Sequence, residues 1–176
     1  MSITKLNNLS IYAVTALPSG VGGKVLQVVS TSKTDTFSLS TGSTYTDITG
    51  LSVSITPSSA SNKILVMYNV SVGSNGTSGF AYTKLLRGST SIFVGDTAGS
   101  RISASNGGTS ISANVTSKHS IQFLDSPATT SATTYKIQAY AQVGTAQIYV
   151  NRTYGDADNS GSSREASSIT VMEIAG

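Results

Sequence analysis

Chemistry in this sequence would have to come from one histidine, a few carboxylates and many hydroxyl groups. The chain has no cysteine, which excludes thiolate nucleophiles and thiolate metal sites. His119 is its one histidine, and a Ser-His-Asp triad needs only one. However, the sequence contains no G-x-S-x-G motif, the turn that exposes the serine of many hydrolases. We therefore predict that His119 lies on the surface or between strands and is not catalytic.

The eight acidic residues form no recognisable acid–base pair. Glycoside hydrolysis, for example, needs two carboxyl groups on either side of one bond. A glycan-degrading activity would therefore require the fold to bring two distant carboxylates together. The carboxylates also include Glu165 and Glu173, but the candidates for such a pair are Asp96, Asp125, Asp156 and Asp158. Because no spacing favours a pair, we predict that the protein is not an enzyme.

One acidic stretch resembles the first half of a calcium-binding loop. Asp156, Asp158 and Ser160, followed by Gly161, have the oxygen-ligand spacing and the glycine of such a loop. The glutamate expected at its twelfth position is missing, because Ser167 stands there. The stretch predicts an acidic turn, with calcium binding as the alternative, and no other cofactor is expected.

The composition favours strands and argues against nucleic acid as a partner. Charged residues make up 11% of the chain, against about 25% in an average soluble domain. Serine, threonine and asparagine are abundant instead, and they favour strands, turns and caps over helix interiors. The net charge is +3, but the basic residues are scattered singly and form no stripe with aromatic residues. Such a weakly charged surface also suits packing against other copies.

No segment predicts membrane insertion. A bilayer-spanning helix needs about 20 apolar residues, and no stretch of this sequence approaches that length. The first residues contain one lysine and no unbroken apolar run, so they do not resemble a signal peptide.

From residue 24 onward the sequence has the period of two that is typical of half-buried strands. Leu51, Val53 and Ile55 alternate with polar residues, for example. Residues 63–72 are almost continuously apolar, which predicts a strand covered on both faces. Residues 133–143 and 146–152, on either side of Gly144, predict a hairpin. The remaining predicted strands are 24–30, 34–40, 51–57, 80–88, 90–96, 119–127 and 167–175.

These strands predict one all-β domain. Several short strands separated by polar loops, without an internal repeat, indicate a sandwich or barrel. An apolar strand at the C-terminal end, 167–175, is typical of a jelly roll in which the last strand is central. We predict a jelly-roll β-sandwich over residues 24–176.

The first 23 residues have a different pattern. They are rich in apolar residues but too short for a helix that is stable alone. They predict an extended or short-helical arm, either a solvated tail or a segment that becomes ordered on a partner. The apolar content favours the second interpretation. The residues that would make the contact are Ile3, Leu6, Leu9, Ile11, Tyr12 and Leu17.

Several stretches, taken together and in order, resemble structural proteins of tailed bacteriophages, especially those of marine cyanobacteria and related hosts. The resemblance covers residues 24–176. Such proteins are similar to the trimeric jelly rolls of the tumour-necrosis-factor and C1q type. The stretches are TDITGLSVSITPSSASNKILVMYNVSVG, KLLRGSTSIFVGD, LDSPATTSATTYKIQ and the final YVNRT, DAD and SSITVMEI.

The resemblance implies a homotrimer that packs flat sheet faces and aromatic residues around a threefold axis. It also implies that residues 1–23 anchor the trimer to other virion proteins. Some or all of the aromatic residues could instead fill the core of the sandwich. The aromatic candidates are Tyr68, Phe80, Tyr82, Phe123, Tyr135, Tyr140 and Tyr149.

The function expected on this basis is that of a virion structural protein, made in the cytoplasm of the bacterial host. We expect a tail fibre or receptor-binding head that contacts a host-surface glycan, with Arg152 and Tyr154 facing the receptor. Alternatives are a capsid decoration or head-fibre protein, and a glycan-binding or glycan-degrading module.

Overall fold

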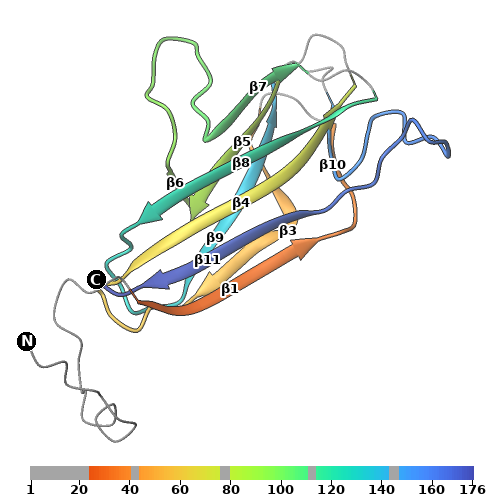
Figure 1. The fold of residues 1–176 in the computed structure, drawn as a ribbon. Helices are drawn as coiled ribbons and strands as arrows, with labels where there is room; N and C mark the ends of the chain where they lie inside the picture. The colour runs from red at the N-terminus through yellow and green to blue at the C-terminus, as the bar shows by residue number, and fades with distance from the viewer. Residues whose placement is uncertain (1–23, 41–43, 76–79, 111–113, 143–146) are drawn as a thin grey trace, which may run out of the picture.

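The computed structural model describes residues 24–40, 44–75, 80–110, 114–142 and 147–176. These residues form two antiparallel sheets packed face to face, and they contain no helix (Figure 1). The predicted all-β fold is therefore confirmed. The predictions for residues 1–23, including the anchoring contacts, concern residues outside the described ranges.

Sheet A has β4 near its centre. β11 pairs with one side of β4 and β1 with β11, while β8 pairs with the other side of β4. The far end of β4 also pairs with β10, which pairs with β2. The strands of sheet A are β1 (Val25–Lys33), β2 (Phe37–Leu39), β4 (Lys63–Ser74), β8 (Thr116–Asp125), β10 (Ile148–Val150) and β11 (Ser167–Ile174).

Sheet B is built around β5 and β9. β9 lies between β3 and β5, and β5 also pairs with β6 and β7. β5 and β6 form a tight hairpin at Gly88, whose φ of 59° suits a residue without a side chain. The strands of sheet B are β3 (Thr46–Ile55), β5 (Phe80–Arg87), β6 (Thr90–Ile92), β7 (Asn106–Ser110) and β9 (Thr133–Ala141).

The chain passes repeatedly between the two sheets, as it does in a jelly roll. β3 to β4, β4 to β5, β7 to β8 and β8 to β9 are all crossings from one sheet to the other. The final strand β11 is central in sheet A, between β1 and β4, as predicted for the end of the chain. The predicted jelly-roll β-sandwich is thus the observed fold.

The core lies between the sheets and follows the predicted alternation. Leu51, Val53 and Ile55 of β3 are buried while the residues between them are exposed. β9 and β11 alternate in the same way along their full lengths. Because every second side chain of a strand points to the same side, each sheet contributes one apolar face to the core.

The predicted hairpin of residues 133–143 and 146–152 is wrong. β9 pairs with β3 and β5 in sheet B, whereas β10 pairs with β2 and β4 in sheet A. Both segments have the pattern of half-buried strands, and that pattern shows which side chains face the core but does not identify the neighbouring strand. β7 was also missed, since its NGGTS sequence contains no apolar residue.

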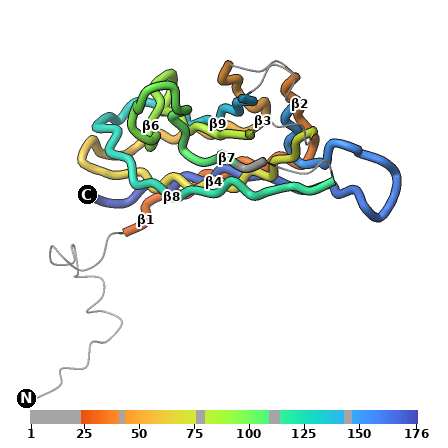
Figure 2. The backbone as a smooth tube through the Cα atoms, turned by 90° about the horizontal axis from the view of Figure 1, so that it is seen from above, coloured from red at the N-terminus to blue at the C-terminus, as the bar shows by residue number. Residues whose placement is uncertain are grey.

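The two ends of the sandwich are distinct. The start of β1 and the C-terminus lie together at one end, where the Ala175 amide donates to the Lys24 carbonyl at 2.9 Å. The long loop 151–166 projects from the opposite end (Figure 2). Residues 1–23 therefore join the domain at the end far from this loop.

Candidate assembly surface

The outer side of β4 is apolar, yet no other part of the described chain lies over it. Ile64, Val66 and Tyr68 point into the core and are buried, whereas Leu65 and Met67 point outward and are only half-buried. A strand with apolar residues on both sides was predicted to be covered on both faces. Sheet B covers the inner face of β4, and nothing in the described residues covers the outer one.

An apolar row runs across sheet A on this outer side. In the strand register, Leu65 lies opposite Met172 of β11 on one side and Leu124 of β8 on the other. Met172 in turn lies opposite Val28 of β1. Val28 is 54% exposed and Leu124 47% exposed. Four neighbouring strands thus present a continuous line of apolar side chains to the outside.

On one side of this row, the next two rows are polar but uncharged; on its other side lie Ile174 and the exposed Lys63. The first of these rows contains Met67 together with hydroxyl and amide side chains. The second contains three serines and Asn69. We call the apolar row and these two neutral rows together the assembly face. The neutral rows are Ser30, Thr170, Met67 and Gln122, and then Ser32, Ser168, Asn69 and Ser120.

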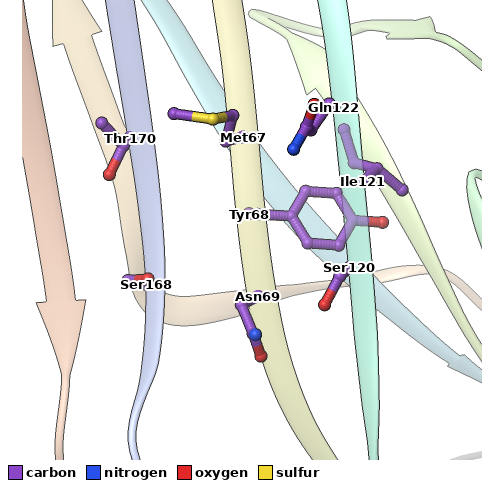
Figure 3. A pocket seen from close by; sticks show the side chains of 8 residues that line it. All are labelled: Met67, Tyr68, Asn69, Ser120, Ile121, Gln122, Ser168 and Thr170. Atoms are coloured by element: carbon purple, nitrogen blue, oxygen red, sulfur yellow. The ribbon is translucent and has the colours of Figure 1, made fainter.

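A shallow hollow of about 470 Å³ lies within the neutral rows (Figure 3). The side chains of Met67, Asn69 and Gln122 surround it, with the hydroxyl groups of serine and threonine residues of β8 and β11. Its lining contains no charged residue. Such a surface can accept a neutral polar or apolar group without burying an unpaired charge.

The apolar surface continues around the β8 edge. The Phe93 ring stacks on Phe123 of β8, with centroids 4.9 Å apart and an angle of 26° between the rings. Phe93 is 46% exposed and Val94 37% exposed. Phe93 has a φ of 50°, whereas bulky residues strongly prefer a negative φ. The local fold therefore imposes a backbone conformation that this residue does not favour by itself.

The aromatic residues expected at a threefold axis do not lie on this face. Tyr68 and Tyr135 are buried between the sheets, which agrees with the alternative that they fill the core. Tyr149 is buried outside that core, against Arg152 and Tyr154 of loop 151–166. Tyr82 and Tyr140 lie opposite each other on the outer side of sheet B. Phe80 precedes Tyr82 on the same side of β5, and Phe123 packs against the core. Apolar aliphatic and methionine side chains provide the assembly face instead.

The predicted receptor-facing residues, Arg152 and Tyr154, both lie in the projecting loop. They differ in how free their side chains are to contact a ligand. The Arg152 guanidinium lies over the Tyr149 ring at 4.0 Å and donates to the carbonyl oxygens of Thr153 and Tyr154. It also donates to the Ser38 hydroxyl at 3.3 Å. The Arg152 guanidinium is therefore already engaged in contacts that stabilise the loop. Tyr154 is 45% exposed and packs beside Tyr149.

The predicted calcium ligands lie in the same loop, next to two arginines. Asp156 accepts a hydrogen bond from Arg164 at 2.8 Å, and the Arg152 guanidinium lies 3.7 Å from the same carboxylate oxygen. The described residues contain no group of three or more His, Cys, Asp or Glu side chains that could hold a metal ion. Calcium binding by Asp156, Asp158 and Ser160 stays a prediction, and these contacts favour the acidic turn.

His119 is inside the sandwich and not on its surface. It is 1% exposed, and its Nδ1 lies 3.2 Å from the Thr83 hydroxyl, which also contacts the Tyr68 hydroxyl. Its Nε2 has no hydrogen-bond partner. Burial lowers the pKa of His119 to about 4, so the imidazole is neutral at physiological pH. A histidine enclosed in this way has no access to a substrate.

Asp125 and Glu173 are buried and act as structural anchors. Asp125 accepts hydrogen bonds from Arg87 at 2.9 Å and from the Tyr135 hydroxyl at 2.7 Å. Burial alone would raise the pKa of Glu173. Hydrogen bonds from Gln27, Asn62 and Ser58 outweigh it and lower that pKa to about 2.

Glu165 is held in a similar way beside the projecting loop. It forms an ion pair with Lys118 at 2.8 Å and accepts hydrogen bonds from the hydroxyl groups of Ser71 and Thr116. Burial opposes ionisation, but these contacts lower the pKa of Glu165 to about 2. A general acid needs a raised pKa to keep its proton at neutral pH. Glu165 and Glu173 have the opposite shift, as expected for carboxylates that support structure.

Comparison with known proteins adds no family to these observations. No family model matches the chain, and no curated protein matches it. Among the described residues, no helix is long and apolar enough to cross a membrane.

Proposed function

We propose that the protein is a structural component of a tailed-bacteriophage virion and that it assembles into a homotrimer through the assembly face. The observation that carries this proposal is the uncovered apolar row centred on Leu65, Met172 and Leu124. Large exposed apolar surfaces with polar surroundings are typical of protein interfaces. The bacteriophage origin is supported by the sequence resemblance over residues 24–176.

The absence of charge on the assembly face makes another copy of the chain a suitable partner. Identical surfaces repel each other wherever a charged group meets its own copy, and the three rows contain no such group. The nearest lysines, Lys63 and Lys118, lie at the two ends of the face, and Lys118 is neutralised by Glu165. Association can therefore bury the apolar row without burying an unpaired charge.

The layout of the two ends supports a displayed head. Residues 1–23 join the domain at Lys24, and loop 151–166 projects from the opposite end. Anchoring through the first segment would direct this loop, with the exposed Tyr154, away from the particle. Three copies of a weak glycan contact in one trimer would bind far more tightly than one. We therefore propose a tail fibre or receptor-binding head without catalytic activity.

Imaging of purified phage particles tests this proposal. We expect copies of the chain in groups of three on the tail, with their assembly faces toward one another and loop 151–166 pointing outward. Groups of three on the capsid surface would indicate the decoration protein instead. Absence of the chain from the particle, or single copies with the assembly face in solvent, would overturn the proposal.

A further inference from the structure

The edges of the two sheets are protected very unequally. An edge strand presents unpaired backbone N–H and C=O groups, and native proteins protect such edges with charges, prolines, bulges, short strands or covering segments. Sheet A ends at β1 and the three-residue β2 on one side and at β8 on the other, and sheet B ends at β3 and at the short β6 and β7. The edge strands can therefore be compared by which of these protecting features each one has.

β8 and β3 each carry protection. The Asn106 side chain donates to the Ser120 carbonyl of β8 at 2.9 Å, and the Phe93 ring stacks on Phe123 of the same strand. In β3 the register is broken between Asp47 and Ser52, and the Asp47 carboxylate is half-exposed. β6 has only three residues.

β1 has none of these devices over most of its length. It has nine residues, and from Val25 to Ser32 it contains no charged residue and no proline. Its one irregularity lies at the very start, between Val25 and Gln27. Val25, Leu26 and Val28 are 41–54% exposed. A long, uncharged and apolar edge of this kind is a ready template for another strand.

We propose that β1 pairs in antiparallel orientation with β1 of a second copy, so that the two A sheets become one continuous sheet. The charges at its ends favour this partner. Lys24, exposed, precedes the strand, and Asp35 follows it. The Asp35 side chain is 78% exposed and pairs with the buried Lys33 ammonium at 2.9 Å. Antiparallel pairing brings Lys24 of each copy to the Asp35 end of the other, whereas parallel pairing would bring like charges together.

The middle of β1 also suits pairing with itself. Val28, Val29, Ser30 and Thr31 are β-branched or hydroxyl residues, which form favourable cross-strand pairs. No residue between the two ends would meet its own charge across the pair. This contact uses the backbone edge of β1, whereas the homotrimer uses the outer side of sheet A, and Val28 lies where the two surfaces meet. The inference therefore does not depend on the proposed function.

Thiol cross-linking tests the orientation directly, because the chain has no cysteine of its own. Lys24→Cys chains mixed with Thr34→Cys chains should give a mixed dimer with a short bifunctional thiol reagent. Each variant alone should give none, because antiparallel pairing separates the two copies of the same end. Dimers from Lys24→Cys alone would show parallel pairing, and no mixed dimer would show that the edges do not meet. Either result overturns the proposal.

Charge substitution at Lys24 provides the second arm. Lys24→Glu places an acid against Asp35 of the second copy and should abolish the dimer that β1 mediates, whereas Lys24→Arg should keep it. The control Ser52→Glu places the same acidic side chain on the protected β3 edge and should change nothing. None of these residues belongs to the assembly face, so trimer formation should be the same in all of them. Equal dimer formation by Lys24→Glu and Lys24→Arg would contradict the proposal.

Hydrogen exchange of full-length protein identifies the occupant of the edge. If β1 pairs with a second copy, the amides of residues 25–32 exchange more slowly as protein concentration rises. Protection that is independent of concentration and lost on deleting residues 1–23 would show that the edge is covered by the chain's own first segment. Fast exchange of half of these amides at all concentrations would show an open edge, filled in the particle by a strand of another protein. Both of these results overturn the pairing of two copies.

Discussion

The outer sides of the two sheets are made from the same kind of strand but have opposite surfaces. On sheet B, Asp47 accepts hydrogen bonds from Lys136 and Gln138, each at 2.7 Å. On the same side the Lys84 ammonium lies over the Tyr45 ring at 3.6 Å. The assembly face of sheet A has no such charged group, and its central row is apolar.

Under our proposal, this difference separates a surface that faces water from a surface that faces another copy of the chain. The inner sides of both sheets are equally apolar, so the core explains neither outer surface. Charged groups that pair across strands keep sheet B hydrated. An apolar row with neutral neighbours gains free energy only when another surface covers it. The contrast supports our proposal that the protein assembles through the outer side of sheet A.

The strongest way to break this comparison is to place a charge in the apolar row. Leu65→Asp should abolish the trimer, because a buried carboxylate without a partner costs about 3–5 kcal/mol per copy. The matched variant Ser52→Asp on sheet B should leave the assembled mass unchanged. Light scattering during size-exclusion chromatography measures both. An unchanged mass for Leu65→Asp would assign assembly to another surface.

The two sides of β8 allow a second comparison. Leu124 on its outer side belongs to the assembly face, whereas His119 on its inner side is buried. The pKa of His119 is lowered from 6.5 to about 4, so the folded state resists protonation. The free energy of unfolding should be greatest above pH 6.5, should fall as the pH decreases toward 4, and should then level off for this group. The shift corresponds to a loss of about 3 kcal/mol at about 1.4 kcal/mol per unit.

Urea unfolding of a monomer with both Leu65→Asp and Lys24→Glu, which removes the β1 contact as well, measures the effect over this pH range without interference from assembly. In a His119→Gln background the decrease between pH 6.5 and 4 should disappear. The decrease due to Glu165 and Glu173 should remain. It begins near pH 4.5 and continues toward 2, because their pKa values are lowered and protonation removes their contribution. An equal decrease in both backgrounds would contradict the assignment to His119.

A smaller effect is expected at the end of sheet A where Glu173 is buried. Glu173→Gln replaces one carboxylate oxygen by an NH2 group. The remaining oxygen can still accept from Asn62 and Ser58, but the NH2 group meets the Gln27 amide, whose hydrogen bond at 2.6 Å it cannot accept. We expect a loss of about 1–3 kcal/mol in the free energy of unfolding. The assembled mass should not change, because this side chain faces away from the assembly face. A loss of trimer without loss of stability would contradict this role.

The smallest effect is expected on the outer side of sheet B. Asp47→Asn removes an exposed ion pair with Lys136, and such pairs contribute at most about 1 kcal/mol. Thermal unfolding should show a correspondingly small decrease that shrinks further at high salt. A large decrease would mean that this side of the molecule is also covered by a partner.

The sequence predicted most of the fold because alternation reports burial directly. Ile169, Val171 and Glu173 share one side of β11, as expected from their spacing, and all three are buried. The near-continuous apolar run of β4 predicted cover on both faces, and this signal identifies the centre of the assembly face. Pairing between distant strands was harder, because β9 and β10 look alike in sequence and belong to different sheets.

The candidate site was less predictable than the fold. The resemblance directed attention to aromatic residues, but Tyr68 and Tyr135 are in the core. The apolar row depends on the register of four strands, since Val28, Met172, Leu65 and Leu124 are neighbours only after β1, β11, β4 and β8 have paired. No local pattern contains that information. Likewise, the Arg152 contacts that fix loop 151–166 depend on Tyr149 and Ser38 from two other strands.

Sedimentation equilibrium of the full-length protein at micromolar concentration tests the central claim most directly. We predict a single species of three times the 18.0 kDa chain mass for Lys24→Glu, which removes the β1 contact, and the chain mass itself when Leu65→Asp is added to it. A native protein that sediments as a monomer would contradict the assignment of the outer side of sheet A as the assembly face.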